Sequence, residues 1–219
     1  LMIFLDDHNK KVISSVRKCG LISLSHSVTE VYKNRSGSKK YLPHNLDTFE
    51  WWTNDQNAKS DFSFWKDYDV TLIIRNPYQR YVSGLRTLWS HKVYGRTYTK
   101  KDKPNENPNV SIKFKDWWEE NFDGDYSFKN PHTSNWLANT KQLEYKSLEV
   151  VDTTHLSKWL GQNGFKELHW HKSNEDNLLE VSMFLQENHK EQVHKFLQVE
   201  AEIYNYWLTS PYYYSKIIS

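Results

Sequence analysis

An arginine that directly follows an apolar run is the strongest chemical signal in this chain of 219 residues. Residues 70–74 are mostly apolar and rich in β-branched side chains, which predicts an interior β-strand, and Arg75 comes next. In open α/β sheets, ligands bind at the carboxyl ends of the strands. A guanidinium at that place suits the bidentate grip of a phosphate, so Arg75 is a candidate anion ligand.

A helix is expected directly after this strand. Asn76 has a side chain that caps helices, and Pro77 suits the first helical position because its φ is fixed and it has no N–H to leave unpaired. Ser83 then lies about 9 Å along the helix axis from Pro77, on a face that it shares with Arg80. We predict that Arg75 and Ser83 hold one phosphate. The alternative for this segment alone is a surface cation and a solvated serine.

A second segment near the amino end repeats this architecture. Residues 12–16 predict a strand, and the basic turn that follows contains Arg17, Lys18 and Gly20. A helix that starts at Ile22 would direct its free N–H groups at a phosphate. The Walker spacing G-x-x-x-x-G-K-[ST] is absent from the whole chain, so the usual phosphate loop of kinases and NTPases is not encoded.

At these two segments the chain resembles the sulfotransferases that use 3′-phosphoadenosine-5′-phosphosulfate (PAPS), and the carbohydrate-modifying branches more than the cytosolic small-molecule ones. The segment VRKCGLISL is similar to the family's 5′-phosphosulfate loop, with matches at Lys18 and Gly20. The segment RNPYQRYVS resembles the family's 3′-phosphate motif R-D-P-x-x-R-x-x-S, with matches at Arg75, Pro77, Arg80 and Ser83. The second match is the stronger one.

The two segments also depart from the family pattern. Leu21 and Ile22 stand where the first motif has hydroxyl-bearing or polar residues, which leaves backbone N–H groups, Lys18 and Ser23 to hold the 5′ end. Asn76 replaces the usual aspartate of the second motif, but asparagine caps a helix as well as aspartate does.

The resemblance implies an α/β fold of the P-loop-NTPase-like kind, with three layers and a central, mainly parallel sheet flanked by helices. It implies PAPS as co-substrate, no metal, and transfer of the sulfuryl group to a hydroxyl or amine, with a carbohydrate as the expected acceptor. A lipid, a peptide tyrosine or a small metabolite stays open as the acceptor. The residues expected to bind the nucleotide are Arg17, Lys18, Cys19, Gly20, Leu21, Ile22, Ser23, Arg75 and Ser83.

The expected catalytic groups are a lysine and a general base. The Lys18 ammonium is the candidate for stabilising charge on the bridging oxygen, because a point charge on a flexible stem can follow that atom. The acceptor must lose a proton to a base. The candidates for the base are His44, Asp47 and Glu50 between the two motifs, and His132 in a later NPHTSNWL element. No spacing ties Cys19 to a base, which argues against a catalytic thiol.

The segments that follow the two phosphate motifs carry information on the fold and little on the site. The resemblance implies a helix at 112–121, a strand followed by a helix at 148–165, and a closing amphipathic helix at 189–207. Apolar residues at helical spacing over 176–207 predict a stripe that faces the core. The similarity covers residues 10–207, and we expect one domain over 1–219.

Composition narrows the classes of protein. Ten Trp, fourteen Tyr and ten Phe predict a core built largely from aromatic rings, and a single cysteine excludes an internal disulfide and a Cys-based zinc site. The net charge of +2 does not require a nucleic-acid partner. The expected partners are the nucleotide co-substrate and an acceptor, with no prediction of oligomeric state.

The sequence contains no apolar stretch of about 20 residues and no signal-peptide pattern. We therefore expect a soluble, cytoplasmic protein, as in a bacterium or a bacterial virus, with a membrane stem outside this sequence left open. Two other functions also stay open. One is a nucleotide-dependent kinase or phosphotransferase, which requires a Walker loop and a magnesium-binding acid. The other is a noncatalytic module that binds glycans or single-stranded nucleic acid.

Overall fold

The computed structural model describes residues 2–6, 10–15, 19, 24, 27, 66–93, 112–130, 133, 137, 144–165 and 175–214, with 2–6 and 91–93 described by their backbone alone. The chain divides into two compact units. The sheet unit comprises Leu1–Pro77, Trp136–Lys172 and Val199–Ser219. The helical unit comprises Tyr78–Asn135 and Ser173–Gln198. The expectation of one domain stays a prediction.

Much of the predicted site falls outside the described residues. The residues of the basic turn and of the segment after it that lie outside are Arg17, Lys18, Gly20, Leu21, Ile22 and Ser23. The base candidates His44, Asp47, Glu50 and His132 also lie outside. Cys19, Arg75, Arg80 and Ser83 are described, and the site is built from them and their surroundings.

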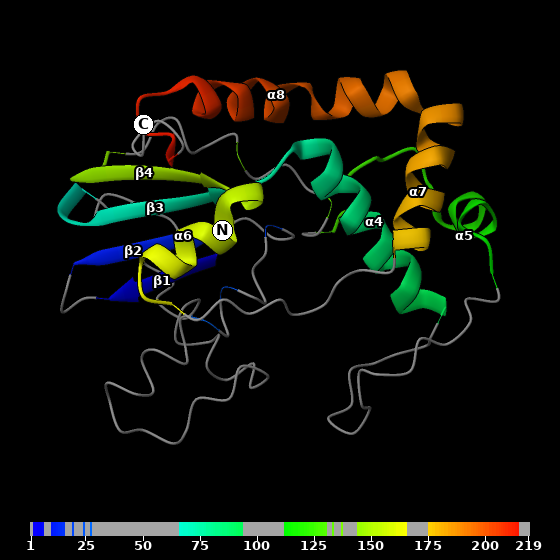
Figure 1. Ribbon diagram of the computed structural model, residues 1–219. Coiled ribbons are helices and arrows are strands. Elements are labelled where there is room, and N and C mark those ends of the chain that lie inside the picture. Colours follow the sequence, from blue (N-terminus) through cyan, green and yellow to red (C-terminus); the bar gives the residue numbers. More distant parts are fainter. Residues whose placement is uncertain are drawn as a thin grey trace. The chain divides into compact units, whose positions relative to one another are not determined.

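Within the described residues, the sheet has four strands in the order β1-β2-β3-β4, the order in which they occur along the chain (Figure 1). They span Met2–Asp6 (β1), Lys11–Ser15 (β2), Asp69–Ile74 (β3) and Ser147–Asp152 (β4). β2 pairs in parallel with β3, and β3 in parallel with β4, while β1 is antiparallel to β2. The strands predicted near residues 12–16, 70–74 and 148–152 are confirmed, whereas β1 was not predicted.

The strands of the sheet unit form because their β-branched and leucine side chains can be buried on both faces. Val12, Leu72, Ile73, Val150 and Val151 are all buried. Beyond the β4 edge, the Val150 N–H donates to the Tyr212 carbonyl over 2.9 Å, and Val150 forms a parallel bridge with Tyr213. The backbone edge of β4 is therefore paired at this point by the segment that follows the closing helix.

Helices from two parts of the chain contact β4. Successive side chains of a strand point to opposite faces, so Glu149 and Asp152 lie on opposite sides of β4. The Trp159 Nε1–H of α6 (Leu156–Gln162) donates to Glu149 Oε2 over 2.6 Å. The Tyr204 hydroxyl of α8 (Lys190–Thr209) donates to Asp152 Oδ2 over 2.7 Å. We infer that α6 and the carboxyl part of α8 contact β4 from opposite sides.

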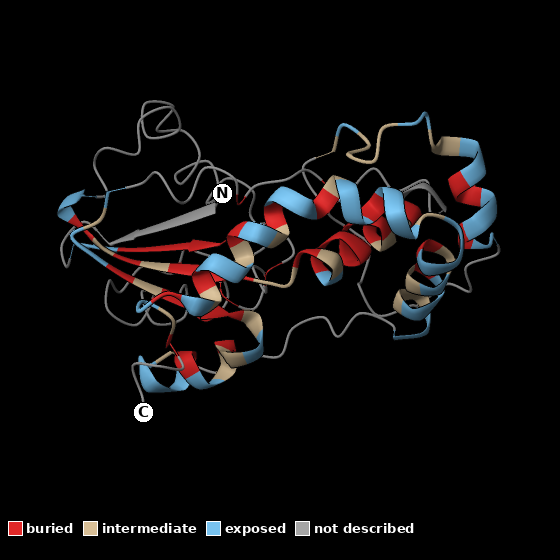
Figure 2. Ribbon diagram, turned by 90° about the horizontal axis from the view of Figure 1, so that it is seen from above, coloured by how far each residue is buried: buried red, intermediate tan, exposed pale blue. Residues whose placement is uncertain are grey.

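The helical unit packs around aromatic side chains. It contains α4 (Pro77–Val93) from Tyr78 onward, α5 (Phe114–Asn121), α7 (Glu175–Asn188) and the amino part of α8. Its core includes Tyr81, Trp89, Phe114, Trp117 and Trp118 together with aliphatic residues of α7 and α8. Figure 2 shows the buried residues as stripes along the helices, as expected for amphipathic helices.

The helices agree with the sequence predictions, with one difference. α4 begins at Pro77, and α5 covers the predicted helix near 112–121. The stripe over 176–207 is confirmed by the burial of Val181, Leu185, Val193, Leu197, Ile203 and Trp207. The stripe belongs to two helices, because α7 ends at Asn188 and α8 begins at Lys190.

The fold class is α/β, with three parallel strands in one sheet and helices that pack beside it. This arrangement is compatible with three layers. Among the described residues, no helix is both long enough and apolar enough to cross a membrane.

Candidate functional site

The carboxyl ends of the three parallel strands meet at one edge of the sheet. In the strand register, Ser15 of β2 is opposite Ile73 of β3, and Ile74 of β3 is opposite Asp152 of β4. Arg75 follows β3 directly and is partly exposed, so its predicted position at this edge is confirmed. Because ligands of parallel sheets bind at the carboxyl edge, this edge is the candidate site.

Cys19, four residues after the end of β2, is hydrogen-bonded to the last residue of that strand. The Ser15 hydroxyl donates to the Cys19 carbonyl over 3.1 Å, and both residues are fully buried. Arg17 and Lys18 lie between these two residues in the sequence. The hydrogen bond therefore ties Cys19, a residue of the predicted basic turn, to the end of β2. Further along, Leu24 is helical and buried, as the predicted helix after Ile22 requires.

Asp152 lies buried at the end of β4, with 2% of its surface exposed, and accepts two hydrogen bonds. The Thr154 N–H donates to Oδ1 over 2.8 Å and caps the short helix Thr153–His155. The Tyr204 hydroxyl donates to Oδ2 over 2.7 Å. Both oxygens of the buried carboxylate therefore have a hydrogen-bond donor.

Tyr204 reaches this carboxylate from α8. Burial raises the pKa of the Tyr204 hydroxyl, and the hydrogen bond to Asp152 and the negative charges of Asp152, Tyr213 and Cys19 raise it further. Sequence analysis missed Tyr204, because a tyrosine in an amphipathic helix gives no signal of which strand end it reaches.

The 3′-phosphate motif continues into a buried face of α4. Arg80 is fully buried, and Ser83 and Thr87 are only 7% and 8% exposed. The Thr87 hydroxyl donates to the Ser83 carbonyl over 3.0 Å. Ser83 is thus not a solvated surface serine, and Arg80 is not a surface cation. Arg75 belongs to the sheet unit and Ser83 to the helical unit, so their joint grip on one phosphate stays a prediction.

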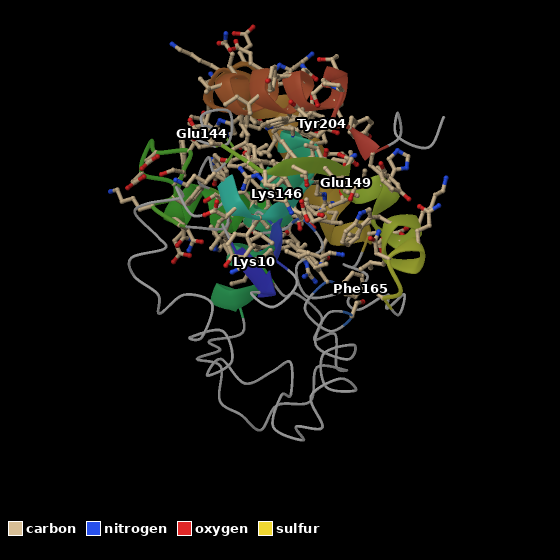
Figure 3. All side chains as sticks on the ribbon, turned by 90° about the vertical axis from the view of Figure 1, so that its left-hand side faces the viewer. Lys10, Glu144, Lys146, Glu149, Phe165 and Tyr204 are labelled. Atoms are coloured by element: carbon tan, nitrogen blue, oxygen red, sulfur yellow. The ribbon has the colours of Figure 1, made fainter. Side chains whose placement is uncertain are left out.

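The amino edge of the same strands has a different character. The Ser147 hydroxyl donates to Asp69 Oδ1 over 2.7 Å, and Lys146 Nζ lies 3.3 Å from Asp69 Oδ2. The hydrogen bond from Ser147, followed by the one from Lys146, holds the pKa of Asp69 below its usual value. Lys10 and Lys146 are labelled at this edge in Figure 3, and the Lys10 ammonium lies 5.1 Å from the centre of the Tyr68 ring. At this edge Asp69 is bonded to Ser147 and Lys146, and Lys10 lies over the Tyr68 ring. These groups therefore stabilise the structure at an exposed position, and we do not assign them to the site.

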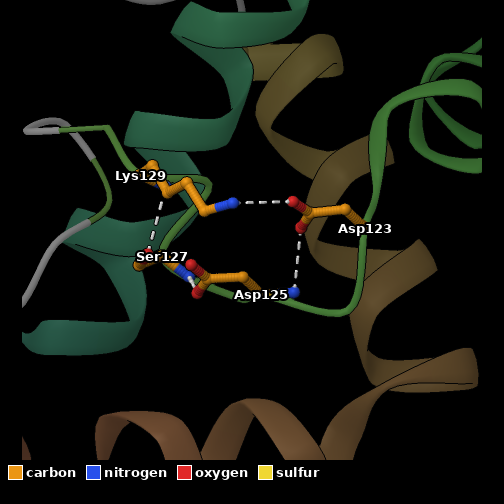
Figure 4. Close-up of polar contacts among 4 residues, drawn as sticks. All are labelled: Asp123, Asp125, Ser127 and Lys129. Atoms are coloured by element: carbon orange, nitrogen blue, oxygen red, sulfur yellow. Dashed lines mark hydrogen bonds and ion pairs between the residues drawn. The ribbon is translucent and has the colours of Figure 1, made fainter.

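A second polar cluster lies in the helical unit, in the turn after α5 (Figure 4). Asp123 and Asp125 accept backbone N–H bonds from Asp125 and Ser127, over 3.0 and 2.8 Å. The Lys129 ammonium lies 3.3 Å from Asp123 Oδ2. The two carboxylates therefore stabilise the turn, and Asp123 also forms an ion pair with Lys129. In the parts of the chain that the structure describes, no group of three or more His, Cys, Asp or Glu residues could hold a metal ion.

Comparison with known proteins assigns neither a family nor a function to this chain. The chain matches no family model, no curated protein and no solved structure. Function is therefore argued from the carboxyl edge of the sheet, where β2, β3 and β4 end.

Proposed function

We propose that this protein is a sulfotransferase that moves the sulfuryl group of PAPS to a hydroxyl or amine acceptor. One observation carries the proposal: β2 and β3 are parallel neighbours, and each leads into a segment with a phosphate-binding pattern. Neighbouring strands lie about 4.8 Å apart, so the turn after β2 and Arg75 start close together at one edge. A ligand with two separate phosphate groups suits such a pair of cationic segments.

The nucleotide is held at its two ends. The Arg75 guanidinium binds the 3′-phosphate, for which its planar set of N–H donors is suited, and Ser83 is the second ligand predicted by the motif. The turn that contains Arg17, Lys18, Cys19 and Gly20 binds the 5′-phosphosulfate through its backbone N–H groups and Lys18. The hydrogen bond from Ser15 to Cys19 supports this role, because it ties the residue after the predicted cations Arg17 and Lys18 to the end of β2.

The reaction is an in-line displacement at sulfur. The acceptor oxygen or nitrogen forms a bond to sulfur while the bond from sulfur to the bridging phosphate oxygen breaks, and adenosine 3′,5′-bisphosphate (PAP) leaves. Negative charge develops on the bridging oxygen, and Lys18 is the residue to which we assign its stabilisation. The acceptor proton passes to a base, for which His132, His44 and Glu50 stay the candidates.

The α/β fold supports this proposal at a coarser level. The order strand, basic turn, strand and capped helix is the order that the P-loop-NTPase-like folds of this enzyme class require. A carbohydrate is the proposed acceptor, because the two motifs resemble the carbohydrate-modifying branches more than the others. The partner of the protein is then a small nucleotide together with a glycan.

Thermal unfolding with and without nucleotide tests the proposal. We expect PAP to raise the unfolding temperature in the presence of EDTA, because the site contains cations of its own and needs no magnesium. A kinase would instead be stabilised by ATP only with magnesium, and a noncatalytic module would be stabilised by neither. Either of those two results would overturn the sulfotransferase proposal.

A further inference from the structure

Among the described residues of the helical unit, three large apolar side chains are exposed to solvent. Leu179 and Met183 of α7 are 58% and 51% exposed, and Ile112 is 43% exposed. α5 and α7 lie beside each other (Figure 1), and the Phe114 N–H at the start of α5 donates to Glu180 Oε1 of α7 over 2.8 Å. Ile112 lies two residues before Phe114. All three exposed side chains therefore belong to the part of the unit where α5 meets α7.

α7 has apolar residues on two of its sides. Val181 and Leu185 lie in the aromatic core of the unit and are fully buried. Leu179 and Met183 lie outside that core. A helix that only covers a core needs one apolar side, with polar residues on the opposite side. The packing of the unit therefore does not require the outer pair of apolar side chains.

The outer side of α7 has the spacing of a helix that pairs with another helix. Asp176, Leu179, Met183 and Gln186 follow one another at intervals of three, four and three residues, and all four are exposed. These intervals place the four side chains in one row, as at the a and d positions of a heptad. We call this row the α7 seam. At 1.5 Å of rise per residue, it is about 15 Å long.

The charged side chains in and beside the α7 seam are all acidic. α7 contains Glu175, Asp176, Glu180 and Glu187 and no basic residue, although the chain as a whole has a net charge of +2. In the heptad of the seam, Glu175 takes a g position, and Glu180 and Glu187 take e positions. Charges at e and g positions select the partner of a paired helix. The seam thus presents two apolar side chains within a negative border.

The stability of the helical unit accounts for only some of these acids. Glu175 and Asp176 are in the first turn of α7, where the helix dipole favours an acid, and Glu180 bonds to the Phe114 N–H. Glu187 is in the last turn, where the dipole disfavours an acid and where α7 has no basic residue. Glu187 therefore lowers the stability of its own helix, and a role in binding gives a reason for its position.

We propose that the α7 seam is a docking surface for a basic amphipathic helix of another protein. Leu179 and Met183 pack against the apolar side chains at the a and d positions of that helix, and its Lys or Arg side chains pair with Glu175 and Glu187. Two apolar side chains make a small contact area, so the complex is a transient one. This inference goes beyond the proposed transferase function and does not rest on it.

The charges of the seam distinguish this partner from other occupants. A second copy of the chain, paired through the same face, would place acids opposite acids, which is destabilising. A helix that lies on a membrane has Lys and Arg on its polar face, and α7 has neither. A nucleic acid would bring its phosphates against carboxylates. A basic polypeptide matches both the apolar pair and the negative border.

The binding of a designed peptide tests the proposal. The probe is a fluorescein-labelled helix of about three heptads with leucine at a and d and lysine at e and g. Fluorescence anisotropy measures its binding to the whole chain. We expect saturable binding that weakens as salt is added, because salt screens ion pairs at a surface. The same peptide with glutamate in place of lysine is expected not to bind. If the lysine peptide does not bind either, the proposal is wrong.

Met183→Glu separates docking in the seam from simple attraction between opposite charges. The variant gains a negative charge, so charge alone would tighten the binding of the lysine peptide, whereas the lost apolar contact weakens it. We expect binding weaker by about tenfold or more. Val199→Glu is the matched control, because it makes the same change of charge at a residue of α8 that is 53% exposed, and no weakening is expected. Circular dichroism checks that both variants fold. Equal or tighter binding by Met183→Glu would overturn the proposal.

Glu187→Lys tests the negative border, and two further measurements test the other occupants. This variant is expected to bind the lysine peptide severalfold more weakly and the glutamate peptide more tightly than the wild type does. Unchanged affinity for both peptides would contradict the role of the border. If sedimentation velocity shows a wild-type dimer that Met183→Glu dissociates, or if phosphatidylglycerol vesicles bind the wild type but not Met183→Glu, the seam has another occupant and the proposal fails.

Discussion

The sheet unit and the helical unit use their polar groups in different ways. In the helical unit, two polar groups among the aromatic rings bond to backbone carbonyls: the Tyr81 hydroxyl donates to the Tyr126 carbonyl over 2.8 Å, and Trp89 Nε1–H to the Ile112 carbonyl over 3.2 Å. In the sheet unit, Arg75 and Asp152 lie where the parallel strands β3 and β4 end. We therefore expect substitutions in the aromatic core to change stability, and substitutions at the strand ends to change the proposed function.

The largest effect on folding is expected from Trp118→Ala in the helical unit. Trp118 is 2% exposed and contacts the rings of Phe114, Phe122, Tyr126, Phe128, Phe184 and His189. Removal of a buried aromatic side chain lowers the free energy of unfolding by about 3–5 kcal/mol. Urea unfolding followed by circular dichroism measures it. Leu179→Ala is the control, because Leu179 is 58% exposed and its loss is expected to cost about 0.5 kcal/mol or less.

For Lys18→Ala we expect a loss of activity without a loss of stability, the opposite of the result expected for Trp118→Ala. We expect the transfer rate from PAPS to fall by about 10²–10³-fold, since the variant loses a cation that stabilises the leaving oxygen, while the urea midpoint stays unchanged. The matched control is Lys11→Ala, which removes an exposed lysine from the start of β2, at the other edge of the sheet. A Lys18→Ala protein that transfers at the wild-type rate contradicts the role given to this lysine.

Arg75→Ala is expected to weaken the binding of PAP more than it slows transfer. Loss of charge-assisted hydrogen bonds to a phosphate costs about 1.5–3 kcal/mol, or roughly ten- to a hundredfold in the dissociation constant. Isothermal titration calorimetry measures the change. Lys146→Ala removes a cation at the amino edge of the sheet and serves as the control. If both variants bind PAP equally well, the carboxyl edge is not the nucleotide site.

The smallest expected effect is a dependence on pH within the helical unit. His189 accepts or donates a hydrogen bond at Nδ1 with the Tyr126 hydroxyl over 3.2 Å, and burial lowers the pKa of its imidazole below the ordinary 6.5. The unfolded chain therefore binds a proton at a higher pH than the folded chain. The contribution of neutral His189 to the free energy of unfolding is fully present above pH 6.5, and it is lost as the pH drops through the lowered pKa.

The contribution of His189 is isolated by His189→Gln, which does not titrate. We expect this variant to lose less of its unfolding free energy than the wild type between pH 7 and pH 5, where both are compared by urea unfolding. Parallel curves for the two proteins would show that His189 contributes nothing to the pH dependence.

The sequence was sufficient for the elements that have strong local signals. The apolar run before Arg75, the cap and proline at its helix start and the stripe on α7 and α8 all predict their structures correctly, because burial and backbone geometry decide them over a few residues. β1 was missed, since its apolar residues near the chain start have a pairing partner in β2 that only the fold reveals.

The connections between distant residues could not be predicted. Tyr204 and Asp152 are 52 positions apart, and nothing in the helical spacing of α8 states that one of its tyrosines reaches the end of β4. The burial of Arg80 and Ser83 depends on packing in the same way. Strand ends, caps and turns follow from local chemistry, whereas the side chains that hold a site in place follow from tertiary structure.

The most direct test of the account is a structure of the protein with PAP bound. We predict that the 5′-phosphate lies against the turn between Ser15 and Cys19, and that the 3′-phosphate accepts hydrogen bonds from the Arg75 guanidinium. A nucleotide bound away from the carboxyl edge of the sheet, or no bound nucleotide at saturating concentration, would contradict the account.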